Sequence, residues 1–257
     1  MTKPILSHSQ ADRADQTKAR ILEAAVQQFS ENGLAGARTE QIAEAAGVNK
    51  ALLYYYFKGK EDLYAAALES VAEGVLASNM AVFDAGGSAG ERFLRSTLSH
   101  FDRLYTNRGF QSLMQQEMVR LHRGEANALS PLVERFFRPL VLRMADVLDE
   151  GIASGELIAV DPAQIRNAAL GANVLYFLSA PLMHLVLGTD LLTLEALKLR
   201  RHAAIEFLGQ AIFVDREHGA RVAARVLAEM PMPKNGGIRP QPVPELRAIK
   251  TEEVRRT

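Results

Sequence analysis

Apolar residues recur every three to four positions along most of the chain, which is the spacing of one face of an α-helix. The first helix that this spacing predicts follows Thr17 and ends at Asn32-Gly33, a helix stop signal. Five apolar residues form its inward face: Ile21, Leu22, Ala25, Val26 and Phe29. The chain contains no run of alternating, β-branched residues long enough for a strand, so the pattern predicts an all-α fold.

The remaining helices are separated by residues that suit helix ends. We expect helices over residues 39–47, 49–57, 61–84, 91–106, 109–122, 130–154, 162–187, 192–213 and 216–230. Asp161 and Pro162 mark one start, because aspartate is a favoured N-cap and proline fits the first helical position. Pro181 should bend the helix that begins there.

The two ends of the chain differ in composition from the middle. Residues 1–16 contain no apolar run and predict a mobile arm rather than a secretory signal. Residues 231–257 hold five of the ten prolines, which predicts a disordered tail. Lys and Arg outnumber Asp and Glu by eight to six in residues 1–60 and by six to three in the tail. In residues 61–230 the acidic residues are more numerous, with twenty-one Asp and Glu against sixteen Lys and Arg. Because local charge decides nucleic-acid binding, the neutral total does not exclude it.

The composition gives no support to metal or redox chemistry. The chain has no cysteine, which excludes disulfides, thiolate zinc sites and a cysteine nucleophile, and which suits a reducing cytoplasm. Its six histidines stand singly, without the paired spacing of a metal site: His8, His100, His122, His184, His202 and His218. We therefore predict no metal, no cofactor and a cytoplasmic location.

Residues 38–64 contain the motif with the strongest functional signal. It predicts a helix, a tight turn at Gly47 and a second short helix, with Ile42 and Leu53 facing inward. The outer face of the second helix is aromatic and basic, and residues 45–60 carry three lysines and no acid. In a major groove, such a face offers hydroxyl donors to phosphates and apolar contact to thymine methyl groups. The alternative is a helical hairpin whose tyrosines pack against a neighbouring domain.

Residues 17–64 resemble the DNA-binding domain of the TetR family of bacterial transcriptional repressors. The resemblance rests on the run Ile42-Ala-x-x-Ala-Gly-Val-x-Lys-x-x-Leu-Tyr-x-x-Phe-x-x-Lys-Glu-x-Leu63, at the family's expected distance behind the first helix. It implies a helix-turn-helix DNA-binding domain over residues 17–62 and a larger helical ligand-binding and dimerisation domain over residues 63–230. It also implies double-stranded operator DNA as a partner.

The resemblance assigns roles to individual residues of the motif. Thr39 caps the second helix and touches a phosphate, and Arg38 adds a further phosphate contact. Tyr54 and Lys60 hold the DNA backbone. Asn49 begins the recognition helix and is itself expected to bind DNA. Five residues of that helix face the bases: Lys50, Ala51, Leu52, Tyr55 and Tyr56. Glu40 and Leu52 depart from common family choices, which leaves the operator sequence open.

The helix over residues 162–187 includes the one segment that could pass for a membrane span. Residues 167–189 carry no formal charge over twenty-three positions, about the length that a bilayer requires. Pro181 and His184 interrupt the segment and no tryptophan marks its ends, so we expect a helix buried in protein, with a membrane segment as the alternative. The resemblance implies a homodimer through helices 162–187 and 192–213. Five residues of the second helix would form the seam: Ala196, Leu199, Ala203, Phe207 and Leu208.

The resemblance also implies an unidentified small-molecule inducer, whose pocket is poorly marked in the sequence. The candidates combine aromatic and methionine surfaces with a few polar groups, a mixture typical of adaptable ligand cavities: Phe101, Tyr105, Met114, Glu117, Met118, Phe137, Asn173, Tyr176 and Phe177. Glu117 is the best polar candidate, because the inward face of its helix is otherwise apolar. A salt bridge to an arginine is the alternative for Glu117, and a plain core position for the others.

The segment Gly86-Gly-Ser-Ala-Gly90 fits the pattern of a hydrolase nucleophile elbow, with Asp190 and His202 downstream. That elbow needs a strand before it, whereas the preceding residues continue a helix, so we expect an interhelical loop. Two hypotheses remain. One is a ligand-responsive DNA-binding repressor that is not an enzyme. The other is an α-helical hydrolase or ligand carrier whose N-terminal domain docks a protein partner.

The helix over residues 61–84 belongs to both domains in the first hypothesis. A ligand that favours one tilt of this helix would alter the separation of the two recognition helices in the dimer. Gly74 is the one glycine inside the helix. It either lends the helix bending freedom or packs against a neighbour.

Overall fold

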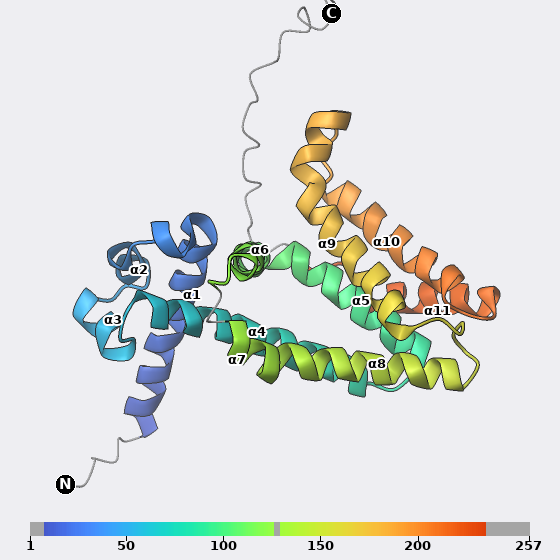
Figure 1. Ribbon diagram of the computed structural model, residues 1–257, viewed down its shortest axis with the longest axis horizontal. Helices are drawn as coiled ribbons and strands as arrows, with labels where there is room; N and C mark the ends of the chain where they lie inside the picture. The colour runs from blue at the N-terminus through green and yellow to red at the C-terminus, as the bar shows by residue number, and fades with distance from the viewer. Residues whose placement is uncertain (1–7, 126–128, 235–257) are drawn as a thin grey trace, which may run out of the picture.

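The computed structural model describes residues 8–125 and 129–234, which are helical almost throughout (Figure 1). The N-terminal helices are α1 (His8–Gly36), α2 (Thr39–Ala45), α3 (Lys50–Tyr56) and α4 (Lys60–Asp84). The others are α5 (Ala89–Thr106), α6 (Arg108–His122), α7 (Leu129–Leu132), the π-helical turn η1 (Val133–Phe137), α8 (Arg138–Ala153), α9 (Pro162–Leu187), α10 (Leu194–Ala211) and α11 (Arg216–Glu229). Within the described residues no strand forms beyond an isolated bridge between Leu157 and Phe213, so the all-α prediction is confirmed.

The first helix is longer than the hydrophobic pattern predicts. α1 begins at His8, so the expectation of a mobile arm over residues 1–16 is wrong for residues 8–16. No glycine or proline stands between Pro4 and Gly33, and glutamine, alanine and arginine favour a helix even where it has no apolar face. The backbone leaves helical geometry at Gly33, whose φ is 68° and ψ is 174°, as the stop signal predicts. Residues 1–7 and the expected tail beyond residue 234 lie outside the described residues.

α2 and α3 form the predicted helix-turn-helix, and α1 packs against them. Gly47 in the turn has a φ of 64°, a left-handed conformation that glycine adopts without steric strain. Ile42 and Leu53 are fully buried and join Ile21 and Phe29 of α1 in one apolar core. The inward face of the motif is therefore the face that the sequence predicts.

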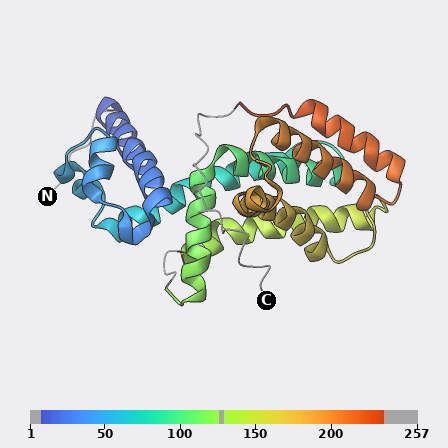
Figure 2. The same ribbon diagram turned by 90° about the horizontal axis from the view of Figure 1, so that it is seen from above.

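α4 contributes to two separate apolar cores. Its first half, from Leu63 to Ala72, belongs to the core of α1–α3, whereas Phe83 near its end belongs to the core of α5 and α8–α11. Figure 2 shows α1–α3 at one end of the molecule and α8–α11 at the other, with α6 between them. Leu113 of α6 and Leu132 of α7 complete the first core. Packing therefore continues past residue 62, where the sequence suggested the end of the DNA-binding domain.

The segment expected as one helix over residues 130–154 is interrupted. α7 ends at Leu132, the π-helical turn follows, and α8 begins at Arg138. Pro139 in the first turn of α8 has no N–H, and its ring would clash with the carbonyl four residues earlier in a uniform α-helix. The wider π turn accommodates this proline. In α9, by contrast, Pro181 lies inside the helix without ending it.

Two glycines allow an unusually close contact between α10 and α11. A Cβ at Gly219 would lie 1.9 Å from the carbonyl oxygen of Gly209, and a Cβ at Gly209 would lie 2.7 Å from the carbonyl oxygen of Gly219. No side chain fits these distances, so only glycine lets the two helices approach this closely. Gly74 of α4 is the opposite case, because no described atom lies within 4 Å of a Cβ built there. The alternative that Gly74 packs against a neighbour is therefore wrong within the described chain.

We expect Gly219→Ala to lower the free energy of unfolding by about 1–3 kcal/mol or more, because α10 and α11 must move apart. Gly74→Ala, at an open position inside a helix, should be neutral or should stabilise by up to about 1 kcal/mol. Urea unfolding followed by circular dichroism compares both variants with the wild type. Equal unfolding midpoints for Gly219→Ala and the wild type would contradict the close contact.

Candidate nucleic-acid interface

The outer face of α3 is exposed and aromatic. Tyr55 is 80% exposed, Tyr54 43% and Leu52 36%, and Ala51 is also exposed. Tyr56 differs, since it packs against the core of α1–α3, with its ring centroid 5.3 Å from that of Tyr55. A hairpin whose tyrosines pack against a neighbouring domain therefore does not describe Tyr54 and Tyr55.

Thr39 has a structural role that differs from the expected one. It is the first residue of α2, and the N-cap position belongs to Arg38, whose side chain makes no capping hydrogen bond within the described chain. The expectation that Thr39 caps the helix is therefore wrong. Its buried hydroxyl lies 3.2 Å from the hydroxyl of Tyr54 and links α2 to α3. Arg38 is exposed and remains a candidate for a phosphate contact.

Asn49 sets the start of α3. Its side-chain oxygen accepts a hydrogen bond from the backbone N–H of Leu52 at 2.7 Å, which satisfies one of the free amides of the first turn. The side-chain oxygen of Asn49 is therefore the N-cap of α3. It fixes the position from which the exposed residues of α3 project.

Lys60 forms hydrogen bonds with the backbone at the end of α1. Its Nζ donates to the carbonyl oxygens of Ala35 and Ala37 at 3.0 and 3.1 Å. Carbonyls at the C-terminal end of a helix lack helical partners, and the helix dipole favours a cation there. A phosphate contact through Lys60 would use the one N–H that these bonds leave. No local pattern signals this link, because its partners lie 25 and 23 positions away in the chain.

A second contact that the sequence did not reveal lies within the motif itself. Lys50, expected to face the bases, forms an ion pair with Glu40 of α2. Hydrogen bonding to Lys50 lowers the pKa of Glu40, and hydrogen bonding to Glu40 raises the pKa of Lys50. Both groups therefore stay charged at neutral pH, and the carboxylate neutralises a lysine of the expected base-reading face.

The residues expected to line a ligand cavity fall into separate places. Met114 and Phe137 pack against the core of α1–α3, and Met118 is 46% exposed on α6. Five others gather between α5 and α9: Phe101, Tyr105, Asn173, Tyr176 and Phe177. One cavity therefore cannot be lined by all of the candidates.

Three rings form an aromatic cluster between α5 and α9. The ring centroid of Phe101 lies 5.1 Å from that of Phe177 and 6.2 Å from that of Tyr176. Asn173, buried nearby, donates to the carbonyl oxygen of Thr97 at 3.1 Å. The cluster thus combines apolar surface with a satisfied amide, a composition that suits an apolar ligand once side chains move to admit it.

Glu117 is completely buried between α4 and α6. Its Oε1 accepts hydrogen bonds from the Tyr64 hydroxyl at 2.7 Å and from Arg120 at 2.9 Å. Burial, and then the bond to Glu117, raise the pKa of Tyr64, so its hydroxyl keeps the proton that it donates. The alternative of a salt bridge to an arginine is therefore confirmed for Glu117.

A surface pocket of about 350 Å³ lies between α10 and α11. Its walls include Arg201 and Glu206 of α10 and Ala224 of α11. Arg201 is buried and pairs with Asp102 of α5 at 2.8 Å. None of the expected ligand residues lines this pocket.

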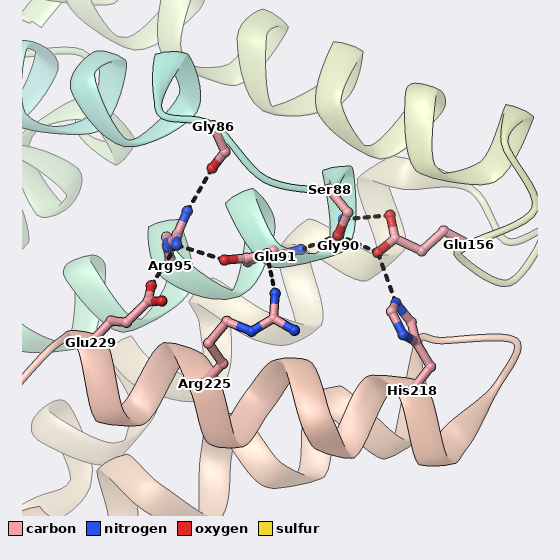
Figure 3. Close-up of polar contacts among 9 residues, drawn as sticks. All are labelled: Gly86, Ser88, Gly90, Glu91, Arg95, Glu156, His218, Arg225 and Glu229. Carbon is pink, nitrogen blue, oxygen red and sulfur yellow. Dashed lines mark hydrogen bonds and ion pairs between the residues drawn. The ribbon is translucent and has the colours of Figure 1, made fainter.

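The loop before α5 is a capping structure and not a nucleophile elbow (Figure 3). Ser88 is the N-cap of α5, and its hydroxyl donates to the carboxylate of Glu156. That carboxylate also lies 3.6 Å from Nε2 of His218 on α11. Helix α4 precedes the loop, and neither Asp190 nor His202 is a hydrogen-bond partner of Ser88 in the described chain. The expected interhelical loop is therefore confirmed.

The protein thus consists of an exposed helix-turn-helix that α4 joins to a larger helical domain. Comparison with protein-family models agrees with this layout. The bacterial regulatory proteins of the tetR family match residues 21–67, and the tetracyclin repressor-like C-terminal domain matches residues 91–208. The chain belongs to the TetR family of bacterial regulatory proteins, and the resemblance noted in the motif is confirmed.

Similarity to individual proteins is strongest in the motif. The transcriptional repressor NicS of Pseudomonas putida is 46% identical over 61 residues, which is 24% of this chain and 29% of the relative. A solved γ-butyrolactone receptor has a TM-score of 0.61 at 20% identity, over 85% of this chain and 99% of that chain. FadR from Bacillus subtilis, solved with stearoyl-CoA, has a TM-score of 0.57 at 22% identity, over 74% of this chain and 96% of that chain. The curated relative is thus matched over less than a third of its length, and the two structures share the fold.

We expect His100 to make folding sensitive to acid. Burial, and then the charge of Arg103, lower the pKa of His100 to about 4 from its ordinary 6.5. The unfolded chain therefore binds the proton more tightly, and stability falls as the pH drops through 6.5 toward 4. The loss between pH 7 and pH 5 should be about 1–2 kcal/mol.

Urea unfolding at pH 7, 6 and 5 measures this loss in the wild type and in His100→Gln. The variant should lose less stability over the same range, because it has no imidazole to protonate. Parallel pH dependences for the two proteins would show that His100 contributes nothing.

Proposed function

We propose that the protein is a ligand-responsive transcriptional repressor that binds palindromic operator DNA as a homodimer and is released by a small-molecule inducer. The observation that carries the proposal is the exposed aromatic face of α3. It stands on a helix-turn-helix whose family comprises regulatory proteins. NicS, which matches this motif, is named a transcriptional repressor. Ser88 serves the fold of α5, so the alternative of a hydrolase gains no support.

The helix-turn-helix suggests how DNA would be contacted. In this motif the second helix enters the major groove, and the first crosses the DNA backbone. Leu52 and the ring of Tyr55 on α3 would meet thymine methyl groups, and the Tyr54 hydroxyl would donate to a phosphate in place of Thr39. Arg38, just before α2, would bind a phosphate as well. Tyr56 packs inward and would support α3 from behind.

We further propose that α9 and α10 pair with the same helices of a second copy. One side of α9 packs against α5 and α8, and the other side is open. Large apolar residues are exposed along both helices: Val174, Leu175, Leu178, Leu182, Leu185, Leu199 and Phe207. Leu199 is 72% exposed and Phe207 70%, and exposed apolar surface of this extent is typical of an interface. Leu208, expected in the seam, instead packs into the core of its own chain, because one residue step turns it away from Phe207.

Charge favours a protein partner over a membrane for this face. α9 is long and apolar enough to cross a bilayer, and 17% of its most apolar window is buried. However, Ile165 and Asn173 hold its other side against the helical core, and Lys198 and Glu206 are exposed on α10. Charged groups around an apolar patch suit the polar rim of a protein interface and are costly in lipid. We therefore place the protein in the cytoplasm, with its DNA.

We propose that the inducer binds at the aromatic cluster of Phe101, Tyr176 and Phe177. FadR, which shares the fold, was solved with stearoyl-CoA, a ligand with a long apolar chain. A ligand between α5 and α9 would act on α5, whose Arg103 donates hydrogen bonds to Ser78 and Asn79 of α4. A shift in α4 would then change the separation of the two α3 helices. Such coupling is reciprocal and typically changes affinity about five- to 150-fold.

Tyr55→Ala should weaken binding to a cognate duplex by about 1–3 kcal/mol and leave binding to random-sequence duplex nearly unchanged, because the ring contacts bases. The cognate duplex is one that the wild type selects from a randomised library. Fluorescence anisotropy measures both affinities. Val119→Ala on α6, which removes exposed apolar surface outside the motif, serves as the control. An equal loss on both duplexes would assign Tyr55 to the DNA backbone instead.

Leu178→Glu should convert the proposed dimer into a monomer at micromolar concentration, because a charge at the centre of the apolar face opposes a second charge across the two-fold axis. Leu142→Glu on α8 is the matched control, since Leu142 is 57% exposed and Leu178 53%. Light scattering gives the mass of each protein. A monomeric wild type, or a dimeric Leu178→Glu, would contradict the interface.

A further inference from the structure

The ion pair between Glu40 and Lys50 lies on the surface that the proposed function turns toward DNA. Glu40 stands in the first turn of α2, and Lys50 is the first residue of α3. The two side chains remain 61% and 50% exposed. Glu40 thus neutralises a lysine at the end of α3 from which a recognition helix meets base edges.

Neighbouring side chains restrain this pair. Nζ of Lys50 lies 5.7 Å from the ring centroid of Tyr54. The hydroxyl of Tyr54 lies 3.2 Å from that of Thr39, which in turn lies 3.5 Å from Oε2 of Glu40. Four side chains from α2 and α3 therefore form a closed ring of contacts. Within this ring, Glu40 determines where the ammonium group of Lys50 stands.

A paired lysine acts differently from a free lysine on DNA of any sequence. Non-specific affinity comes from cations that neutralise phosphates and release counterions, with a salt slope of about 0.9 for each phosphate. Lys50 beside Glu40 brings no net charge to the DNA backbone, and the carboxylate is itself repelled by phosphates. The pair therefore weakens binding wherever phosphates are the only partners.

A base pair can satisfy both members of the ion pair at once. In the major groove, guanine O6 and N7 accept hydrogen bonds from lysine, and the N4 amino group of cytosine donates to glutamate. A G·C pair thus offers acceptors to Lys50 and a donor to Glu40, whereas a phosphate offers acceptors alone. Because the ion pair is exposed, it can exchange its mutual bond for these partners.

We propose that Glu40 is a specificity-determining residue of the DNA-binding surface. On non-operator DNA, Glu40 stays paired with Lys50, so that this lysine does not bind a phosphate. At a G·C pair in each operator half-site, the ion pair opens and Lys50 binds the guanine. This inference rests on the proposed DNA-binding function and adds to it a residue that discriminates by repulsion.

The test compares the full-length wild type with Glu40→Gln and with a control, Glu44→Gln. Glu44 is an exposed acid one turn further along α2 that forms no ion pair within the described chain, so it controls for the loss of one negative charge. Each protein is titrated with random-sequence duplex at several salt concentrations, and with the duplexes that the wild type selects from a randomised library. Glu40→Gln frees one lysine in each of the two subunits, so it should bind random duplex about sixtyfold more tightly at 0.1 M salt, with a salt slope steeper by about 1.8. Its preference for the selected duplexes should fall accordingly.

Lys50→Gln distinguishes a withheld lysine from simple repulsion by Glu40. Introduced into the wild type, it should weaken binding to random duplex only by the repulsion of the unpaired Glu40 carboxylate, whereas in Glu40→Gln it should reverse the whole gain. Library selection with either single variant should lose the G·C preference at one position of each half-site. Equal gains in Glu40→Gln and Glu44→Gln, or the same effect of Lys50→Gln in both backgrounds, overturn the inference. A wild type that binds neither random nor selected duplex contradicts the proposed function instead.

Discussion

The hydrogen bond from the Tyr64 hydroxyl to Glu117 joins α4 to α6 beside the core that α1–α3 share with them. A carboxylate with no exposed surface needs partners, and Tyr64 of α4 and Arg120 of α6 supply them. Tyr64 also packs edge-on against Phe29 of α1, with ring centroids 5.0 Å apart. One side chain thus ties α1, α4 and α6 together. Loss of either hydrogen-bond partner would leave Glu117 less well satisfied in an apolar core, where its Oε2 already has no partner within the described chain.

α6 also binds α1 directly. Ser112 and Gln116 both donate to the carbonyl oxygen of Ser30 on α1, at 2.7 and 3.2 Å. α6 follows α5 after a single residue, Asn107, whose side chain caps it. Phe101 stands near the end of α5, so a ligand that displaces its ring would act on α6 through a short and stiff connection. Two routes, α4 and α6, therefore lead from the proposed ligand region to the DNA-binding end.

The buried half of the helix-turn-helix was predictable from sequence because it depends on local spacing. Ile42 and Leu53 fall on inward faces set by the helical period, and the turn between them requires the φ of Gly47. The contacts of Lys60 and Glu40 were not predictable in this way. Each joins side chains of different helices, and amphipathic spacing does not specify which polar partners meet. The ligand candidates divided for the same reason, since spacing identifies buried aromatic residues but not the core to which each belongs.

α9 shows the same limit of sequence analysis, because its sequence indicates that it must be buried but not what buries it. Its uncharged sequence demanded apolar cover on nearly every side, yet the described chain covers one side only. Exposed apolar surface costs roughly 25 cal/mol per Å² in water, and this cost favours association. In a two-fold dimer the open face would meet itself, and α9 and α10 would then hold the two copies at a fixed distance. Each α4 runs from the core shared with these helices to its own α3, so the interface would also fix the spacing of the two recognition helices. The apolar face that is exposed in the single chain would thereby determine the spacing of the operator half-sites that the dimer can bind.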